Sequence, residues 1–494
     1  MRKNNYRKTA AALLAASLML AGCASGSSEQ GTSAASKESS SVSESVSYAS
    51  TEAETVAETE PDEVAAEVEA IKSWSTIKLL DNASSTSDTT VKIGDDNKVT
   101  IQEGGNYVVT GKLTEGVLSV KTTDENAKVV IKLAGVTISN SEKTALKVKS
   151  AGNVIIYLEE GTENVITSGK ETVIKELVDE AASESEEAAT GGAINSACDL
   201  TICGPGSLSS YGYLKMGIHS KGVLKITGGS LDVKAVANGI KGNNGVTITG
   251  GSLSILSGND AIKTESSSQP YSDINISGGK VGINAFGDGI QATGTVTVSG
   301  GTIDIRQSKE GLEAPNVLIN DGQLSIRSDD DGINASKSSK DGSNTMIFNG
   351  GKVYVNAGGD GLDSNGDLIV TGGELQIAGP TKGKSGALDN GNENGGVLLI
   401  SGGTVIAIGS TGNDKVFSES SSQCAFEVHL NFSEGDVITV SGSDGTVLYT
   451  FEAIKTGSSI VFSSPDLKKG ETYTISAGSN KKEITLTETV VTDN

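Results

Sequence analysis

Carboxylates recur at a regular spacing in the second half of the sequence, in a pattern suited to binding a divalent cation. An acidic residue stands before Gly-Ile, Gly-Leu or Ala-Ile at Asp260, Asp288, Glu310, Asp331 and Asp360. Two carboxylates about 5 Å apart can share one Ca²⁺, whose oxygen ligands lie at about 2.3–2.6 Å. The position three residues further on also becomes acidic along the chain. We therefore predict Ca²⁺ bound by Glu310, Glu313, Asp330, Asp331, Asp360 and Asp363. The alternative for any single aspartate is ordinary turn chemistry, in which its carboxylate accepts hydrogen bonds from nearby backbone amides.

Four cationic residues of the same segment are candidates for binding an anionic ligand. Arg306 and Arg327 occupy equivalent positions in neighbouring repeats, where we expect them to stack on adjacent turns. A planar guanidinium suits bidentate contact with the carboxylate of a uronic acid. Lys241 and Lys263 occupy the position that becomes acidic further along the chain. The alternative is that each arginine neutralises a neighbouring aspartate on a solvated face.

An internal repeat must position these residues. A Gly-Gly pair, or its Asp-Gly variant, precedes an alternating apolar and polar run, and its second glycine recurs at Gly229, Gly251, Gly279, Gly301, Gly322, Gly351, Gly373 and Gly403. Such a unit holds two or three short strands joined by tight turns. One unit cannot bury its apolar side alone, so neighbouring units must stack into a solenoid. The sequence therefore predicts an all-β fold, a parallel β-helix over residues 76–410.

The repeat stops near residue 411, and the remaining chain has strands without the glycine pair. An open end of a solenoid would expose unpaired backbone groups. We predict that residues 411–494 form a small C-terminal β cap. The extra residues of the longer repeats, 266–270 and 337–343, enter at one turn and mark the expected working face.

The N-terminus carries the features of an export signal. Residues 1–9 are basic and polar, residues 10–21 are small and apolar, and Leu20-Ala21-Gly22-Cys23 follows, an arrangement typical of a secretory signal over residues 1–22. This tetrapeptide resembles the lipobox of bacterial lipoproteins, which implies that Cys23 is lipidated. Residues 23–75 are rich in serine and glutamate, and such a composition favours a disordered acidic tether. We expect the extracellular face of a cell membrane as the location.

Composition excludes several classes of function. The formal net charge is −23 at pH 7, so nucleic acid is not an expected partner because binding it needs a basic face. The chain has only two histidines, far apart in sequence, which excludes a histidine-rich metal centre. Aromatic residues make up 4% of the chain, which argues against a flat aromatic platform for crystalline cellulose. We expect a monomer.

Several segments resemble the bacterial carbohydrate-binding β-helix proteins, of which a clostridial cellulose- and pectin-binding member is typical. These are IQEGGNYVVTGKLTEGVLSV at 101–120, INSACDLTICGPGS at 194–207 and, most specifically, GTEN at 161–164. The resemblance covers about residues 90–490. It implies a right-handed, pectate-lyase-like β-helix, binding of plant polysaccharides or acidic sugars, and bound calcium.

We interpret the chain as a surface-anchored, non-catalytic lipoprotein that binds plant or acidic polysaccharide with the assistance of Ca²⁺. Its expected partners are an acidic or cellulosic polysaccharide and, through the lipid anchor, a membrane. One alternative is a calcium-dependent polysaccharide lyase, in which a lysine or arginine removes a proton beside the uronate carboxyl group. The other alternative is a structural cell-surface adhesin or spacer without a sugar site.

Overall fold

The computed structural model describes residues 62–172, 174, 191–266, 272–336, 344–383, 385–391, 395–411 and 415–493. They all belong to one compact unit, Glu58–Asn494. The predicted signal peptide at 1–22, the predicted lipidation site Cys23 and the tether up to residue 61 lie outside these residues. Within the described ranges, no helix is long and apolar enough to cross a lipid bilayer.

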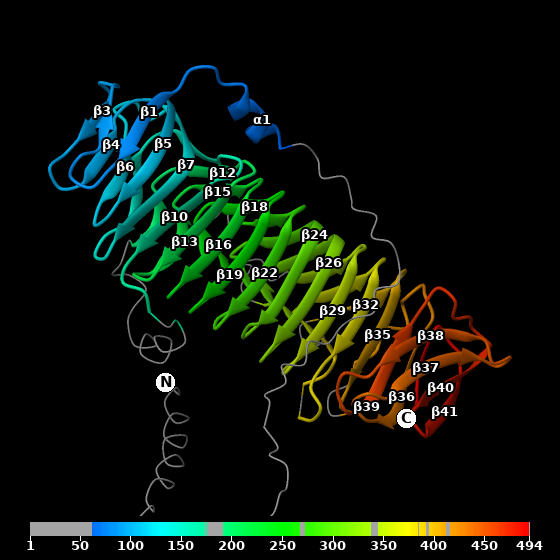
Figure 1. The fold of residues 1–494 in the computed structure, drawn as a ribbon. Helices are drawn as coiled ribbons and strands as arrows, with labels where there is room; N and C mark the ends of the chain where they lie inside the picture. Colours follow the sequence, from blue (N-terminus) through cyan, green and yellow to red (C-terminus); the bar gives the residue numbers. More distant parts are fainter. Residues whose placement is uncertain are drawn as a thin grey trace, which may run out of the picture. The chain divides into compact units, whose positions relative to one another are not determined.

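The regular secondary structure of the described chain is almost all β-strand, and three sheets contain the strands (Figure 1). Sheet A, the largest, comprises β1 (Ser75–Leu79), β2 (Ser85–Thr86), β5 (Gly105–Leu113), β7 (Lys128–Asn140), β9 (Asn153–Leu158), β10 (Glu163–Ser168), β12 (Asp199–Cys203), β13 (Ser207–Gly212), β15 (Val223–Ile226), β16 (Ser230–Ala235), β18 (Gly245–Ile248), β19 (Ser252–Ser257), β21 (Ile274–Ile276), β22 (Lys280–Ala285), β24 (Thr295–Gln307), β26 (Asn316–Ser328), β28 (Thr345–Phe348), β29 (Lys352–Ala357), β31 (Asp367–Val370), β32 (Glu374–Ala378), β34 (Leu398–Ile400), β35 (Thr404–Gly409), β36 (Ala425–Phe432), β39 (Gly457–Ser463) and β42 (Val490–Thr492).

Sheet B faces sheet A across the core and comprises β3 (Val91–Ile93), β4 (Lys98–Ile101), β6 (Val117–Lys121), β8 (Leu146–Ser150), β11 (Gly192–Ser196), β14 (Met216–Ser220), β17 (Ile240–Gly242), β20 (Ile262–Thr264), β23 (Ile290–Gln291), β25 (Leu312–Ala314), β27 (Ile333–Ala335), β30 (Leu362–Ser364) and β33 (Leu388–Asn390). Sheet C comprises β37 (Val437–Gly442), β38 (Val447–Glu452), β40 (Thr472–Ala477) and β41 (Asn480–Thr485).

The strands stack in parallel from one turn of the chain to the next, which confirms the predicted parallel β-helix. In the central turns, each turn supplies one strand to sheet B and two to sheet A, as β17, β18 and β19 do. β16 pairs with β19 from Ser230↔Ser252 onward, so the pairing offset equals one sequence repeat. Both loop insertions leave sheet B at the ends of its strands, after β20 and β27. Residues 267–271 and 337–343 of these insertions lie outside the described residues.

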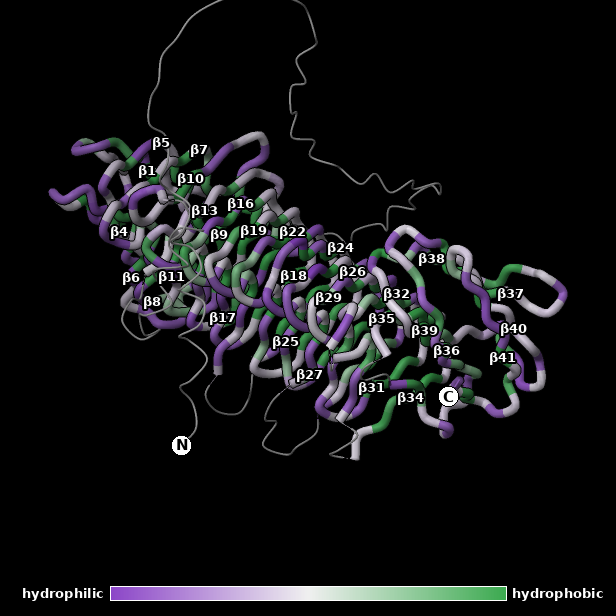
Figure 2. Tube along the Cα trace, turned by 90° about the horizontal axis from the view of Figure 1, so that it is seen from below, coloured by the Kyte–Doolittle hydropathy of each residue, from purple (hydrophilic) through white to green (hydrophobic). Residues whose placement is uncertain are grey.

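Alternation of side chains builds the core of the solenoid. In β19, Leu253 and Ile255 point inward and are almost fully buried, and the residues between them point outward. Figure 2 shows hydrophobic and hydrophilic positions alternating along the strands. Burial of each such leucine or isoleucine contributes about 1.5–3 kcal/mol. Because every turn repeats this pattern, the inward side chains form one continuous hydrophobic cluster along sheets A and B.

The second glycine of each repeat is required by the backbone. Gly251 has φ of +86°, a region that L-residues rarely adopt, and a Cβ there would lie 2.9 Å from the Gly229 carbonyl oxygen. Gly279, Gly301 and Gly351 share this conformation and crowding. The regular glycine spacing of the sequence therefore reflects one turn geometry used in every repeat.

The structure differs from the prediction at the end of the tether. Residues assigned to the disordered segment 23–75 include helix α1 (Glu63–Glu69), whose Asp62 N-cap accepts a 3.0 Å hydrogen bond from the Ala65 amide. Ala65 and Val68 are buried against an apolar patch on the outer face of sheet A, made of Val130, Ile155, Tyr157 and Cys203. The segment is ordered because this small patch gives its few apolar residues a place to bury.

The C-terminal cap is confirmed. β39 pairs with β35 in antiparallel orientation, from Ser463 to Ser459, so parallel stacking ends at this strand. β36 continues the sheet, again antiparallel to β39, and sheet C packs beside it around a separate hydrophobic cluster that contains Phe426 and Phe462. The last turn of the solenoid is therefore covered rather than left with an exposed edge.

Candidate functional site

From β8 to β33, each strand of sheet B carries one polar residue that stands on the outer face and stacks in register with its neighbours. Its flanking residues in each strand, such as Ile240 in β17 and Ile262 in β20, point into the core. The resulting polar column contains Lys147, Asn195, His219, Lys241, Lys263, Gln291, Glu313, Asn334, Asp363 and Asp389. The column changes from basic to acidic along the solenoid. Figure 2 shows strands β4, β6, β8, β17, β25 and β27 following one another along one side.

A second column of acidic residues, Asp260, Asp288, Glu310, Asp331 and Asp360, stands at the turns before β20, β23, β25, β27 and β30. Each of the four aspartates reaches the next turn and accepts a hydrogen bond from the backbone amide at the equivalent position, whereas Glu310 accepts from the side chains of Lys309 and Asn334. Asp260 accepts from Asp288 at 2.9 Å, Asp288 from Glu310 at 3.2 Å, and Asp331 from Asp360 at 2.7 Å. These bonds run to the next turn of the solenoid, 22 to 29 residues along the chain, rather than to amides of the same turn as the alternative for the single aspartates expects. They use one oxygen of each carboxylate, so a role in cation binding is compatible with them.

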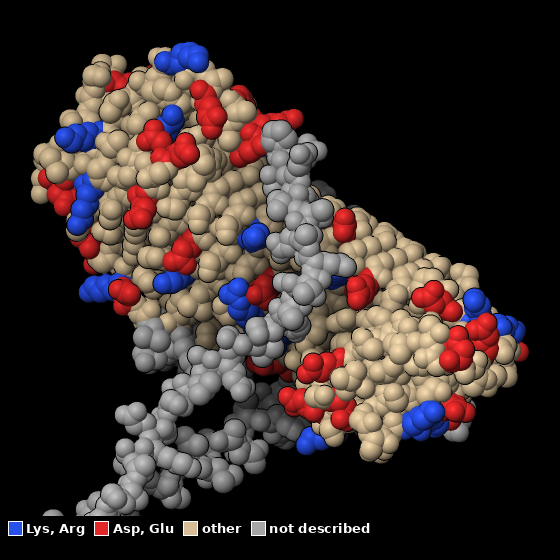
Figure 3. Space-filling model, turned by 45° about the vertical axis from the view of Figure 1, so that its right-hand side comes forward, with Lys and Arg blue, Asp and Glu red and all other residues tan. Residues whose placement is uncertain are grey.

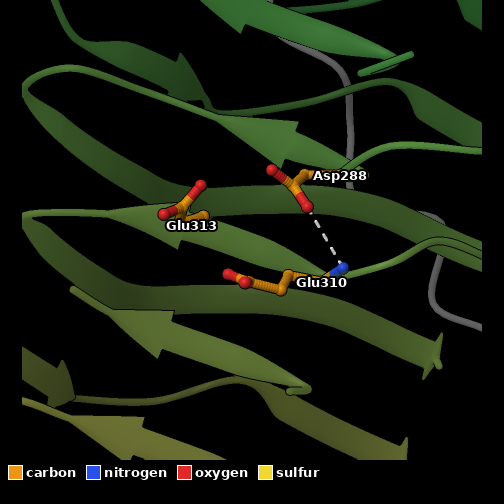
Figure 4. A group of neighbouring side chains, drawn as sticks. All are labelled: Asp288, Glu310 and Glu313. Carbon is orange, nitrogen blue, oxygen red and sulfur yellow. Dashed lines mark hydrogen bonds between the residues drawn. The ribbon is translucent and has the colours of Figure 1, made fainter. Parts of the chain in front are cut away.

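Asp288, Glu310 and Glu313 form the first carboxylate triad, in which one oxygen of each lies within 4.8 Å of the others. Figure 4 shows them facing one another from adjacent turns, with the Glu310 amide donating to Asp288. Burial, followed by the charges of Asp260, Glu310 and Glu313, raises the pKa of Asp288 to about 7. Burial and the charge of Glu313 also raise the pKa of Glu310. Ionised carboxylates crowded in this way are destabilising unless a cation joins them.

Asp331, Asp360 and Asp363 form the second triad, again with one oxygen of each within 4.8 Å of the others. All three are partly buried. Burial and neighbouring carboxylates raise the pKa of Asp331 to about 7, that of Asp363 to about 7 and that of Asp360 to about 6. The second triad therefore has the same electrostatic character as the first.

Asn334 lies between the two triads and links them. Its side-chain Nδ2 donates to Glu310 Oε2 at 3.2 Å and to Asp331 Oδ2 at 3.4 Å. Asn334 is only 8% exposed, and its Oδ1 atom is buried without a hydrogen-bond partner among the described residues. An unpaired buried acceptor is costly. A hard cation with oxygen ligands would satisfy this atom and the carboxylates together, so the residues present fit a metal ion.

The structure groups most of the predicted metal ligands. Glu310 and Glu313 belong to the first triad, and Asp331, Asp360 and Asp363 form the second. Asp330 is exposed and belongs to neither triad. Asp288 completes the first triad but was missing from the predicted ligands, although it begins the same acid-Gly-Ile triplet.

The predicted cationic residues fall on two different sheets. Lys241 and Lys263 belong to the polar column of sheet B, where Lys241 pairs with Glu265 and Lys263 with Asp260 at 2.9 Å. Arg306 and Arg327 are exposed on β24 and β26 of sheet A.

Arg306 pairs with Asp304 of its own strand at 2.7 Å, as the neutralisation alternative predicts. A register shift pairs Asn284 with Gln307, so Arg306 leaves the column in which we expected it. On the face drawn in Figure 3, basic side chains stand beside acidic ones over much of the solenoid.

Comparison with known proteins identifies a family of similar sequences. The model of the carbohydrate-binding domain-containing protein family matches residues 95–339 and 308–467. A protein of that description from Acetivibrio thermocellus is 32% identical over 140 residues, which are 28% of this chain and 46% of that protein. The chain thus matches less than half the length of that relative. A solved structure of a polysaccharide lyase-like protein from C. thermocellum, a gadolinium derivative, is 29% identical with a TM-score of 0.41, covering 50% of this chain and 96% of that one. Because the family model matches well over half of the sequence, this chain belongs to the carbohydrate-binding domain-containing protein family.

Proposed function

We propose that this chain is a surface-anchored, non-catalytic lipoprotein that binds acidic polysaccharide with the assistance of Ca²⁺. Family membership supports carbohydrate binding. The single observation that carries the proposed role of Ca²⁺ and of an acidic ligand is the pair of carboxylate triads joined by Asn334 on the outer face of sheet B.

The donor set of the two triads favours Ca²⁺ among common cations. All the donors are carboxylate or amide oxygens, and Ca²⁺ accepts six to eight oxygen ligands in flexible geometry. Asp288, Glu310 and Glu313 would hold one ion, and Asp331, Asp360 and Asp363 another, with Asn334 Oδ1 beside both groups. Bound Ca²⁺ supplies positive charge to which the carboxylate of a uronic acid can coordinate. The preference for acidic over cellulosic polysaccharide follows from this chemistry.

The ion pairs of the basic residues support a binding role rather than a lyase. Elimination from a uronate needs a base that can accept a proton close to the sugar. Lys241 and Lys263 are engaged with Glu265 and Asp260, and Arg306 is engaged with Asp304. An ammonium or guanidinium group in an ion pair donates hydrogen bonds and accepts none.

Surface anchoring is proposed from the sequence of the N-terminus. The Leu20-Ala21-Gly22-Cys23 tetrapeptide follows a basic and then apolar segment. Acylation of Cys23 with more than one chain would hold the protein on a membrane, since a single chain binds only marginally. Mass spectrometry of the protein from its native membrane tests this: a diacylglycerol-sized increase on Cys23 is expected, and an unmodified N-terminus would refute it.

Affinity electrophoresis tests the binding proposal directly. The full chain carrying Cys23→Ser is run through gels with and without polygalacturonate or soluble cellulose derivatives, in Ca²⁺ and in chelator. We expect retardation by polygalacturonate that increases with Ca²⁺, and no growth of ultraviolet absorbance from unsaturated product. Growing absorbance would identify a lyase instead. Absence of retardation in every gel would favour the adhesin or spacer.

A further inference from the structure

The first turns of sheet B carry a group of lysines outside the site described above. Val99 and Ile101 of β4, Leu118 and Val120 of β6, and Leu146 and Val148 of β8 point into the core. The residues that alternate with these inward ones point outward. Four of them are lysines, here called the lysine cluster: Lys98, Lys121, Lys147 and Lys149.

The register of these strands places the lysine cluster around one serine. Ser119 of β6 pairs with Thr100 on one side and with Lys147 on the other. Lys121 lies two residues after Ser119 and, because the register shifts there, pairs with Ser150, the residue that follows Lys149. Lys98 lies two residues before Thr100. Neighbouring strands are about 4.8 Å apart and alternate residues of one strand about 7 Å apart. The four amino groups thus originate within one small area of sheet B.

Among the described residues, no carboxylate pairs with the lysine cluster. None of its four amino groups lies within ion-pair distance of a carboxylate of the residues that the structure describes. The pKa of Lys149 is lowered chiefly by the charge of Lys98, then by burial, Lys147 and Lys121, so the amino groups repel one another. Elsewhere on the solenoid, Lys241, Lys263 and Arg306 each have an acidic partner. Like charges that lack a partner on a stacked sheet are costly, so their grouping indicates an external anion.

A second, independent observation points to the same place. The Ser119 hydroxyl is fully buried at the centre of the lysine cluster and has no hydrogen-bond partner in the part of the chain that the structure describes. Buried polar groups are normally paired. A carboxylate that settled among the four amino groups would offer this hydroxyl an acceptor.

We propose that the lysine cluster and Ser119 form a metal-independent subsite for carboxylate groups of an acidic polysaccharide, on the same sheet as the carboxylate triads. This inference rests on the proposed function, because it assigns to the same ligand a second set of contacts. Lys147 and Glu313 belong to one polar column and are six strands apart, about 29 Å at 4.8 Å per strand. A polymer is long enough to contact both the lysine cluster and the carboxylate triads, whereas a single sugar is not. The lysines meet its carboxylates directly, and the triads meet them through Ca²⁺.

Affinity electrophoresis in chelator isolates this subsite from the metal-dependent one. In polygalacturonate gels of low ionic strength, the Cys23→Ser chain is compared with the same chain carrying Lys147→Gln and Lys149→Gln. The matched control carries Lys280→Gln and Lys352→Gln, which remove the same charge from exposed positions of sheet A. We expect the first pair to weaken binding about five- to tenfold, as the loss of two partly exposed ion pairs predicts. The control is expected to bind like the parent.

Two further arms separate the possible outcomes. Ser119→Ala is expected to weaken binding in chelator while leaving the melting temperature unchanged or higher, since it removes an unpaired buried hydroxyl. Parent binding that appears only with Ca²⁺, or a lysine variant that behaves like its control, would overturn the subsite and leave the proposed function intact. No binding of the parent with or without Ca²⁺ would overturn the proposed function itself. Equal competition by inorganic polyphosphate would refute the assignment to a polysaccharide carboxylate.

Discussion

Replacing Asp363 with asparagine should change thermal stability in opposite directions with and without Ca²⁺. Asp363 is part of the second triad, and burial and the charges of Asp331, Asp360, Asp389 and Glu310 raise its pKa to about 7. Asparagine has nearly the same shape and removes one negative charge. In chelator at pH 8 the variant should therefore melt higher than the parent. Addition of Ca²⁺ should raise the melting temperature of the variant by less than that of the parent, because the variant has lost an ionised ligand.

The magnitudes follow from the pKa and from the size of the folded unit. A pKa near 7 instead of 3.8 for Asp363 corresponds to about 4 kcal/mol at 1.36 kcal/mol per unit. Because the side chain is partly exposed, screening reduces the usable part to about 1–2 kcal/mol. Unfolding entropy of about 2.1 cal/mol/K per residue gives about 0.9 kcal/mol/K for the unit Glu58–Asn494. Removing the charge should thus raise the melting temperature in chelator by about 1–2 °C.

Under the proposed function, Ca²⁺ should produce the larger effect. At a free concentration one hundred times the dissociation constant, each ion stabilises the folded state by about 2.7 kcal/mol. Two ions should raise the melting temperature of the parent by about 6 °C, and the Asp363→Asn variant should lose about half of this gain. Differential scanning calorimetry measures both quantities. Asp321→Asn is the matched control, because Asp321 is exposed on β26 of sheet A.

The pH dependence provides an independent check of the same electrostatics. Carboxyl groups whose pKa is raised in the folded state bind more protons there than in the unfolded chain, so without Ca²⁺ their contribution to stability falls as pH rises. For Asp288, Asp331 and Asp363, whose pKa values rise from 3.8 to about 7, this loss is concentrated between about pH 4 and 7. The parent should lose more stability over this interval than Asp363→Asn. A variant that melts lower than the parent in chelator, or a parent unaffected by Ca²⁺, would refute the reasoning.

Three further predictions concern the scaffold. Gly251→Ala should lower the free energy of unfolding by about 1–3 kcal/mol in chemical denaturation, because φ is +86° and the added Cβ lies 2.9 Å from a carbonyl oxygen, whereas Gly161→Ala, with φ of +69° and open space, should cost less. Val68→Asp should release α1 from sheet A, which a red shift of Trp74 fluorescence and early proteolysis near residue 70 would report; an unchanged emission would contradict the packing. Burial lowers the pKa of Lys455, which donates to the carbonyl oxygens of Ala357 and Gly379, to about 8, so the unfolded chain binds more protons above that pH. The stability of the parent relative to Lys455→Met should accordingly rise between pH 8 and 10, and a flat difference would contradict this sign.

The repeat and the acidic column were predictable because each turn of the solenoid faces the same physical demands. The same backbone turn recurs, so glycine recurs where φ is positive, as at Gly229 and Gly251. The same inward positions recur, so apolar residues alternate in every strand. Stacking in register then brings equivalent residues together, and this is why the contact of Glu310 with Asp288 follows from spacing alone.

The parts that were not predicted depend on local departures from that regularity. A register shift at Asn284 removes Arg306 from its expected column, and no repeat spacing reveals a shift of one residue. Asp330 and Asp331 are adjacent, but successive residues point in different directions, and only Asp331 joins the triad. Helix α1 escaped prediction because its order comes from a patch on sheet A that is assembled from three distant strands.

Stacking identical positions at about 4.8 Å makes charge in a β-helix collective, and this links the two ends of sheet B. A single lysine or aspartate costs little stability, but the same residue type at equivalent positions of stacked strands creates repulsion between like charges. Residues of the same column cannot neutralise this repulsion. The middle of the column avoids this cost through the pairs of Lys241 with Glu265 and Lys263 with Asp260. The lysine cluster and the carboxylate triads, towards the two ends of the sheet, are not neutralised in this way. In the proposed function, anions join the lysine cluster and cations join the triads, and a carboxylated polymer with Ca²⁺ would supply both. Ligand binding should therefore stabilise the whole length of the sheet rather than one turn.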